Sequence, residues 1–153
     1  MKIKWKKILK FIGYVFSPIA LGGLVTAIVG SKAYKVIKKP PFSPPGIAFP
    51  IVWSILYLLM GIGHYLVQKD EFNKKTFIIF SEQLLANLLW SFLFFKFQLF
   101  VISAVWIVLI QGLLIATIIR FLEKNKIAGY LQFPYFIWLI LALYLNIGVA
   151  ILN

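Results

Sequence analysis

Aromatic and amide side chains recur at helical spacing along three apolar stretches of the sequence. They form three stripes: Trp53, Tyr57, Met60 and His64; Gln83, Asn87, Trp90 and Phe94; and Tyr135, Trp138, Ala142, Leu145 and Val149, with Asn146 beside the last. Residues three or four positions apart share one face of an α-helix. Indole and phenol rings stack on flat apolar molecules, and an amide or phenol can satisfy a carbonyl or carboxylate on such a molecule. The stripes therefore predict a pocket for a hydrophobic ligand.

Each of these side chains also has a purely structural explanation. The amides of Gln83, Asn87 and Asn146 can each form an interhelical hydrogen bond, worth roughly 0.6 to 2 kcal/mol in a membrane, and the sequence leaves this alternative open. Tryptophans also gather at membrane interfaces, which suits Trp5 among its lysines. The tryptophans within the stripes instead share faces with other aromatic or polar side chains, which favours a pocket.

Other kinds of chemistry find little support in the sequence. It has no cysteine, and His64 is its only histidine. The four acidic residues lie near the ends of apolar segments, at Asp70, Glu71, Glu82 and Glu123. Because a metal site needs several ligands close together, we expect no metal, and we interpret His64 as a satisfied or interfacial histidine. No Ser-His-Asp arrangement, glycine-rich phosphate loop or pair of intramembrane carboxylates occurs, so we expect no hydrolysis, phosphoryl transfer, ion pumping or cofactor.

The elements that must position the stripes are long and apolar. Of the 153 residues, 62% are hydrophobic and 13% are charged, whereas a soluble domain is roughly 45 to 50% apolar. Five apolar segments each approach the roughly 20 residues that cross a bilayer. They are residues 8–29, 47–67, 77–95, 99–122 and 128–152. We therefore expect an all-α fold, an integral membrane five-helix transmembrane bundle that forms one domain over residues 1–153.

Basic residues set the expected orientation of this bundle. Eleven Lys and Arg residues flank the segments on the side of the N-terminus, and five lie on the other side. By the positive-inside rule the N-terminus is cytoplasmic in a bacterial plasma membrane, and the first loop lies outside. The net charge of +12 comes from lysines at segment ends, where they contact lipid phosphates. We therefore expect membrane lipids as partners and no nucleic acid.

Three stretches carry a resemblance to a known family. They read YKVIKKPPFSPPGIAFPIVWSILYLLMG, QLLANLLWSFLFF and FPYFIWLILALYLNIGVAILN. The sequence resembles the TspO/MBR family, the tryptophan-rich sensory proteins or translocator proteins, along essentially its whole length. The resemblance implies a five-helix bundle, a homodimer in many members, and a pocket under the first loop for porphyrins or other hydrophobic molecules. Prolines in that loop exclude a helix and reduce its ordering entropy, so we expect a semi-rigid lid.

The resemblance also carries over site residues by position. Together with the stripes it predicts the ligand-binding residues Tyr34, Trp53, Tyr57, Gln83, Asn87, Trp90, Tyr135, Trp138, Ala142 and Asn146. Two positions depart from the family pattern, because Ala33 and Phe42 stand where tryptophans are usual. Neither side chain has an indole N–H, so polar contacts from the loop are reduced.

These observations support three functions of different classes. The one we favour is a membrane protein that binds tetrapyrroles and related hydrophobic ligands, for sensing, buffering or transport. An alternative is light- and oxygen-dependent breakdown of bound porphyrin, in which Trp53 and Trp138 would be catalytic as oxidisable rings. The third is an accessory subunit that regulates a larger membrane complex.

Overall fold

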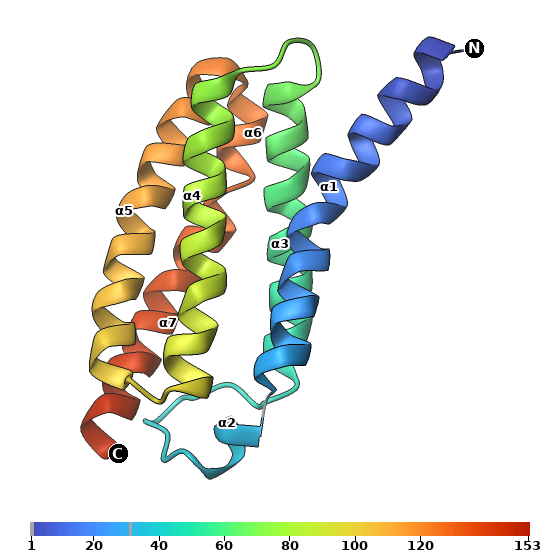
Figure 1. Ribbon diagram of the computed structural model, residues 1–153. Helices are drawn as coiled ribbons and strands as arrows, with labels where there is room; N and C mark the ends of the chain where they lie inside the picture. The colour runs from blue at the N-terminus through green and yellow to red at the C-terminus, as the bar shows by residue number, and fades with distance from the viewer. Residues whose placement is uncertain (1, 31) are drawn as a thin grey trace.

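The computed structural model describes residues 2–30 and 32–153, and these residues form helices and loops without a strand (Figure 1). The helices are α1 (Lys2–Val29), α2 (Lys32–Val36), α3 (Ala48–Gln68), α4 (Lys74–Ser91), the π-helical turn η1 (Phe92–Lys96), α5 (Phe100–Lys124), α6 (Lys126–Tyr130) and α7 (Phe133–Leu152). Five spans, formed by α1, α3, α4 with η1, α5, and α6 with α7, are long and apolar enough to cross a membrane. The expected all-α five-span bundle is thereby confirmed.

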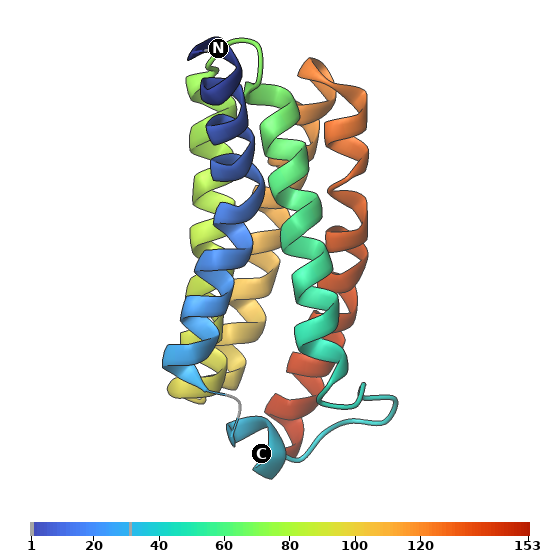
Figure 2. The same cartoon turned by 90° about the vertical axis from the view of Figure 1, so that its right-hand side faces the viewer.

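The long helices lie side by side, and the first loop lies at one end of the bundle. Figures 1 and 2 show α2 and the loop before α3 at the same end as the C-terminus. Helix α1 packs mainly on α3, and α5 packs on both α4 and α7. The N-terminal half of α1 leans away from the other helices (Figure 1).

Three spans differ from the segments expected from the sequence. The first, α1, begins at Lys2 and not near residue 8. The fifth is two helices, because Asn125 caps α6 by accepting a hydrogen bond from the backbone N–H of Ala128 at 3.0 Å, and α7 starts afresh at Phe133. Pro134 favours this new start, since its missing N–H has no helical partner in a first turn. The third span begins earlier than expected, because the side chain of Asn73 caps α4.

Glycines allow α1 and α3 to approach closely. Gly61 of α3 packs on the backbone of Val15, and Gly22 of α1 packs on the ring of Tyr57. Neither position has room for a Cβ atom. Close packing at small residues is a main source of helix association in lipid, where apolar burial gives little driving force.

The outer surface of the spans is apolar, as a lipid-facing surface must be. Val101, Val105 and Ile137 are 69%, 67% and 65% exposed, whereas Ile107, Leu114 and Phe121 are at most 1% exposed inside the bundle. Exposure of aliphatic side chains on an outer face carries no free-energy penalty when the hydrocarbon of a bilayer surrounds them. The burial pattern therefore supports the membrane assignment independently of segment length.

Candidate ligand-binding site

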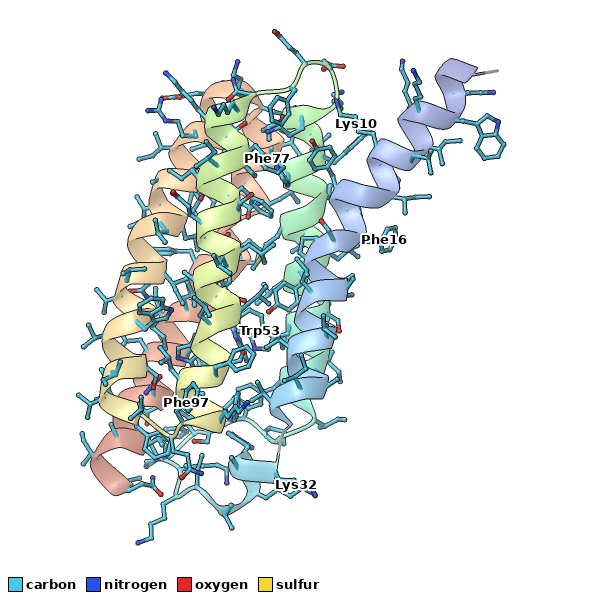
Figure 3. The ribbon with its side chains drawn as sticks, in the orientation of Figure 1. Lys10, Phe16, Lys32, Trp53, Phe77 and Phe97 are labelled. Carbon is cyan, nitrogen blue, oxygen red and sulfur yellow. The ribbon has the colours of Figure 1, made fainter. Side chains whose placement is uncertain are left out.

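A small cavity lies between α3, α4 with η1, and α7, beneath the loop that joins α2 to α3. Its walls are formed by Tyr34, Lys39, Ser43, Phe49, Trp53, Trp90, Phe94, Phe95, Trp138, Ala142, Leu145, Asn146 and Val149. Six predicted ligand-binding residues are among them: Tyr34, Trp53, Trp90, Trp138, Ala142 and Asn146. Figure 3 shows Trp53 within the bundle, in the half nearer to α2. Three spans and the loop thus meet at one place, although their sequences are far apart.

The cavity is almost filled by its own side chains. Its volume is about 30 Å³, enough for about one water molecule. Sites for drug-sized ligands measure roughly 300 to 1,000 Å³. The sequence predicted an accommodating pocket, whereas the structure shows a closed one whose walls must separate before a large ligand can enter.

Aromatic rings line the cavity in a continuous series. Tyr34 and Phe49 have ring centroids 4.9 Å apart, Phe49 and Trp138 are 5.8 Å apart, and Trp138 and Trp53 are 6.5 Å apart with their planes at 86°. All three contacts are edge-to-face, which aromatic rings prefer to a face-to-face sandwich. Trp53 continues the series to Tyr57, at 5.3 Å. The rings therefore connect α2 to the centre of the bundle.

The π-helical turn places two consecutive phenylalanines in the cavity wall. Phe94 stacks on Trp90 at 5.0 Å, and Phe95 approaches the same indole edge-on at 5.8 Å. In a regular α-helix neighbouring residues point about 100° apart, but the wider π turn changes these directions. Single π turns are frequent at functional sites, so η1 supports the assignment of this cavity.

The amide of Asn146 joins two spans at the edge of the cavity. Its Oδ1 accepts a hydrogen bond from the indole N–H of Trp90 at 3.0 Å, and its Nδ2 donates to the carbonyl of Phe100 at 2.7 Å. Asn146 is 1% exposed. The interhelical hydrogen bond that the sequence left open is therefore present here.

Four predicted residues lie outside the cavity, namely Tyr57, Gln83, Asn87 and Tyr135, and all four are buried. The phenol of Tyr57 donates to Asn87 Oδ1 at 2.8 Å, and Asn87 Nδ2 donates to the phenol oxygen of Tyr135 at 2.7 Å. This network ties α3, α4 and α7 together. Gln83 makes no side-chain hydrogen bond to the described residues. In this closed state Trp53 connects the network to the cavity, since its ring contacts both phenols at 5.3 and 5.8 Å.

The loop over the cavity, residues 37–47, is held to the end of α7, and we call it the lid. Tyr144 donates from its phenol to the carbonyl of Pro41 at 2.8 Å. The side chain of Asn153 accepts from the backbone N–H of Lys38 at 3.0 Å and donates to its carbonyl at 2.9 Å. Gly148, one turn after Tyr144, leaves room for a proline of the lid. Helix α7 therefore contributes several of the contacts that position the lid.

Comparison with known proteins agrees with this architecture. The model of the TspO/MBR family matches residues 11–152. The chain belongs to the TspO/MBR family. A tryptophan-rich protein TspO of Chlorobaculum tepidum is 35% identical over 86% of both chains. A tryptophan-rich sensory protein of Cereibacter sphaeroides is 30% identical over the whole of this chain and 95% of its own. A translocator protein of Ovis aries is 31% identical over 88% of this chain and 85% of its own.

In this TspO/MBR chain Tyr34 links α2 to the lid. Its phenol donates to the carbonyl of Pro44 at 3.0 Å, and burial raises the pKa of that phenol above its usual value of 10.0. Tyr34 therefore stays a neutral hydrogen-bond donor at physiological pH. Phe42, which stands at a usual tryptophan position of the family, is 93% exposed at the tip of the lid and does not line the cavity.

Trp138 separates the cavity from the surrounding lipid. It lines the inner cavity and also an apolar groove of about 280 Å³ on the outer surface between α3 and α7. Val52, Ile55 and Ile137 lie along the same groove. One half-buried indole is thus the wall that the two spaces share.

His64 lies deeper in the bundle, outside the cavity. It stacks on Phe80 with centroids 4.0 Å apart and meets Tyr14 edge-on at 4.7 Å. Neither ring nitrogen has a hydrogen-bond partner among the described residues, so of the two alternatives, a satisfied or an interfacial histidine, the first finds no support in these contacts. The described part of the chain also holds no group of three His, Cys, Asp or Glu side chains close enough for a metal.

The sequence interpretation missed several residues of the site. Phe49 precedes Trp53 by four positions, so helical spacing alone could have placed it on the same face. Phe95 could not be found in this way, because its direction depends on the π turn. Lys39 and Tyr144 gave no local signal, since their roles depend on how the lid folds back on α7.

Proposed function

We propose that this protein is a membrane binding protein for porphyrins and related flat hydrophobic molecules, which it senses, buffers or transports. The observation that carries the proposal is the cavity in which Trp53, Trp90 and Trp138 meet beneath a lid, with Asn146 at the edge. Several indoles around one space suit an extended aromatic macrocycle, because each indole offers a large apolar face. The names of the relatives, a sensory protein and a translocator protein, fit a protein that handles a small molecule.

Binding requires the closed cavity to open, and the contacts suggest where. The Tyr57–Asn87–Tyr135 network and the Trp90–Asn146 hydrogen bond tie the three spans together inside the bundle. The hydrogen bonds that hold the lid to α7 are exposed instead. The lid therefore moves more readily than the helices, and the indoles of the wall can then rotate to accept a macrocycle.

The orientation of the protein follows from its charges. Basic residues number eleven at the end with the N-terminus and five at the end with the lid. We therefore propose a cytoplasmic N-terminus and a lid on the outer side of the membrane. The cavity then receives its ligand from the outer leaflet or from the space outside it.

Titration of protoporphyrin into the purified protein in nanodiscs, in the dark, tests the binding function. We expect saturable quenching of tryptophan fluorescence, weakened by Trp53→Leu and left unchanged by Trp5→Leu, since Trp5 is 61% exposed at the far end of α1. Absence of saturable quenching would overturn the proposal and favour a role as an accessory subunit of a larger complex.

A second candidate function is light-dependent breakdown of the bound porphyrin. It is favoured by the pair Trp53 and Trp138, whose oxidisable rings face one cavity with centroids 6.5 Å apart. Illumination of the complex in air should then change the porphyrin absorbance spectrum. The change should be lost in Trp53→Phe and Trp138→Phe while dark binding is retained, with Trp5→Phe as the matched control. A spectrum that changes equally in all variants would exclude these indoles as the oxidised groups.

A further inference from the structure

We propose that Lys39 is a ligand-binding residue that selects hydrophobic molecules carrying a carboxylate. This inference rests on the proposed function and goes beyond it by assigning the recognition of an anionic group to one side chain. The ligand class is then an amphipathic acid with a flat apolar body, such as a porphyrin with free propionates, in preference to a neutral macrocycle of the same shape.

The position of Lys39 is unusual for a lysine. Its side chain lines the cavity together with tryptophans and phenylalanines, and it is half-buried. The ammonium Nζ donates to the carbonyl of Ile37, two residues away, at 3.1 Å and lies 4.7 Å from the ring centroid of Tyr34. Both partners are neutral. The ion pairs among the described residues are Lys69–Asp70 and Arg120–Glu123, so Lys39 has no carboxylate within 4.0 Å.

An ammonium group has three N–H donors, and only one of them is used by a hydrogen bond here. Apolar walls reduce its contact with water, which strengthens its attraction for an anion. A carboxylate that approached from the cavity could therefore form a charge-assisted hydrogen bond without displacing an existing ion pair. The side chain is thus available for a ligand.

The distribution of charge at this end of the molecule supports an anionic ligand. The basic side chains at the lid end are Lys32, Lys35, Lys38, Lys39 and Lys96. None of the four acidic side chains of the sequence belongs to the lid, to α2 or to the turn around Lys96. Figure 3 shows Lys32 at this end of the bundle, opposite Lys10. A surface of one sign around an apolar opening attracts counter-charged ligands and raises their association rate.

The neighbouring residue Lys38 provides a matched control within the chain. It carries the same charge and is exposed, but its side chain does not line the cavity. The lid contacts at this position are made by its backbone N–H and carbonyl, which bond to Asn153. Replacement of the Lys38 side chain therefore removes one positive charge from the lid without changing the cavity or the lid contacts.

The geometry also predicts how the ligand lies. With its carboxylate at Lys39 under the lid, the apolar body extends toward Trp53 and Trp138 at the bottom of the cavity. The lid must move and the walls must separate far enough to admit the ring system, after which the anionic edge lies next to the polar end of the site. This orientation keeps the charged group out of the hydrocarbon core, where it would be costly.

The test compares protoporphyrin, which carries two propionates, with its dimethyl ester, which has the same ring system and no charge. Dissociation constants are measured in the dark by tryptophan quenching for the full-length protein in nanodiscs of neutral lipid. We expect the unaltered protein to bind the diacid more tightly than the ester. Lys39→Met should weaken diacid binding about tenfold, as expected for one lost hydrogen bond between charged groups, and leave ester binding unchanged. Lys38→Met removes one of the five basic charges near the opening, so it should leave ester binding unchanged and weaken diacid binding much less than Lys39→Met does. Lys39→Arg should retain most of the preference for the diacid.

The outcomes separate this proposal from the proposed function. Equal loss of diacid and ester binding in Lys39→Met, or equal loss of diacid binding in Lys38→Met and Lys39→Met, would overturn the assignment of Lys39 and leave porphyrin binding standing. Equal affinity of the unaltered protein for the diacid and the ester would also overturn it. Failure of the unaltered protein to bind either compound would overturn porphyrin binding itself.

Discussion

Weakening the attachment of the lid should increase the apparent affinity for a porphyrin. The double variant Tyr144→Phe with Asn153→Ala removes the hydrogen bonds of 2.8, 2.9 and 3.0 Å that hold the lid to α7. These bonds are partly exposed, so each contributes about 0.5 kcal/mol, near the lower end of the usual range. Together they favour the closed lid by about 1.5 kcal/mol, which corresponds to about tenfold in the population of the open state.

The direction of the effect follows from the closed cavity of about 30 Å³. If only the open state binds, the apparent dissociation constant equals the intrinsic one divided by the open fraction. The variant should therefore bind protoporphyrin up to about tenfold more tightly, as long as the open state remains the minor one. The tighter binding should come from a faster association rate. If the lid contacts served instead to hold a ligand, the same variant would bind more weakly.

Stopped-flow quenching of tryptophan fluorescence measures the association rate, and limited trypsin digestion measures lid opening without a ligand. Trypsin should cleave after Lys38 faster in the double variant than in the unaltered protein. Tyr130→Phe is the matched control, because Tyr130 is 60% exposed in α6, at the end of the bundle opposite the lid. Faster cleavage with an unchanged association rate would refute the reasoning. It would indicate that the ligand enters through the lipid-facing groove beside Trp138 and not under the lid.

Three further substitutions test the packing that supports the site, each measured by thermal unfolding in detergent. Gly61→Ala should destabilise by about 1 to 3 kcal/mol because a Cβ would overlap the backbone of α1, whereas Gly112→Ala, with nothing within 4 Å, should not. Asn87→Ala should destabilise by about 1 to 3 kcal/mol because two buried phenols lose a partner; an unchanged midpoint would argue against the network. Gln83→Leu should preserve or raise the free energy of unfolding, since the amide is buried without a hydrogen-bond partner. A large loss would show that the amide bonds the neighbouring phenol of Tyr135.

The sequence predicted the spans and the inward faces well because both depend on local periodicity. A run of about 20 apolar residues is long enough for a bilayer, and positions three or four apart share a face whatever surrounds them. Met60 and Val149, for example, are 0% and 2% exposed, as inward positions should be. The same reasoning placed Trp53 and Trp138 in one wall, since each belongs to an aromatic stripe on its own span.

Features that depend on contacts between distant segments could not be predicted in this way. The direction of Phe95 depends on the π turn, and the break before Phe133 depends on a side-chain cap and a proline acting together. The volume of the cavity depends on how side chains from three spans fit together, which no spacing rule describes. The fit between the spans also decides which polar residues bond to other helices, as Asn87 does, and which lie at the edge of the cavity, as Asn146 does.

The ring of Tyr57 connects the wall of the cavity to α1, so binding of a ligand near the lid can change the position of α1 at the other side of the membrane. It touches Trp53 at 5.3 Å and fills the space left by Gly22 of α1. A bound ligand that displaces this indole would also displace the phenol. The phenol packs closely against α1 at Gly22, so α1 would move with it. Helix α1 continues to the lysine-rich end of the protein, so its movement on ligand binding would be detectable there. A spin label near Lys10 that stays still when protoporphyrin binds would rule out such mechanical signalling.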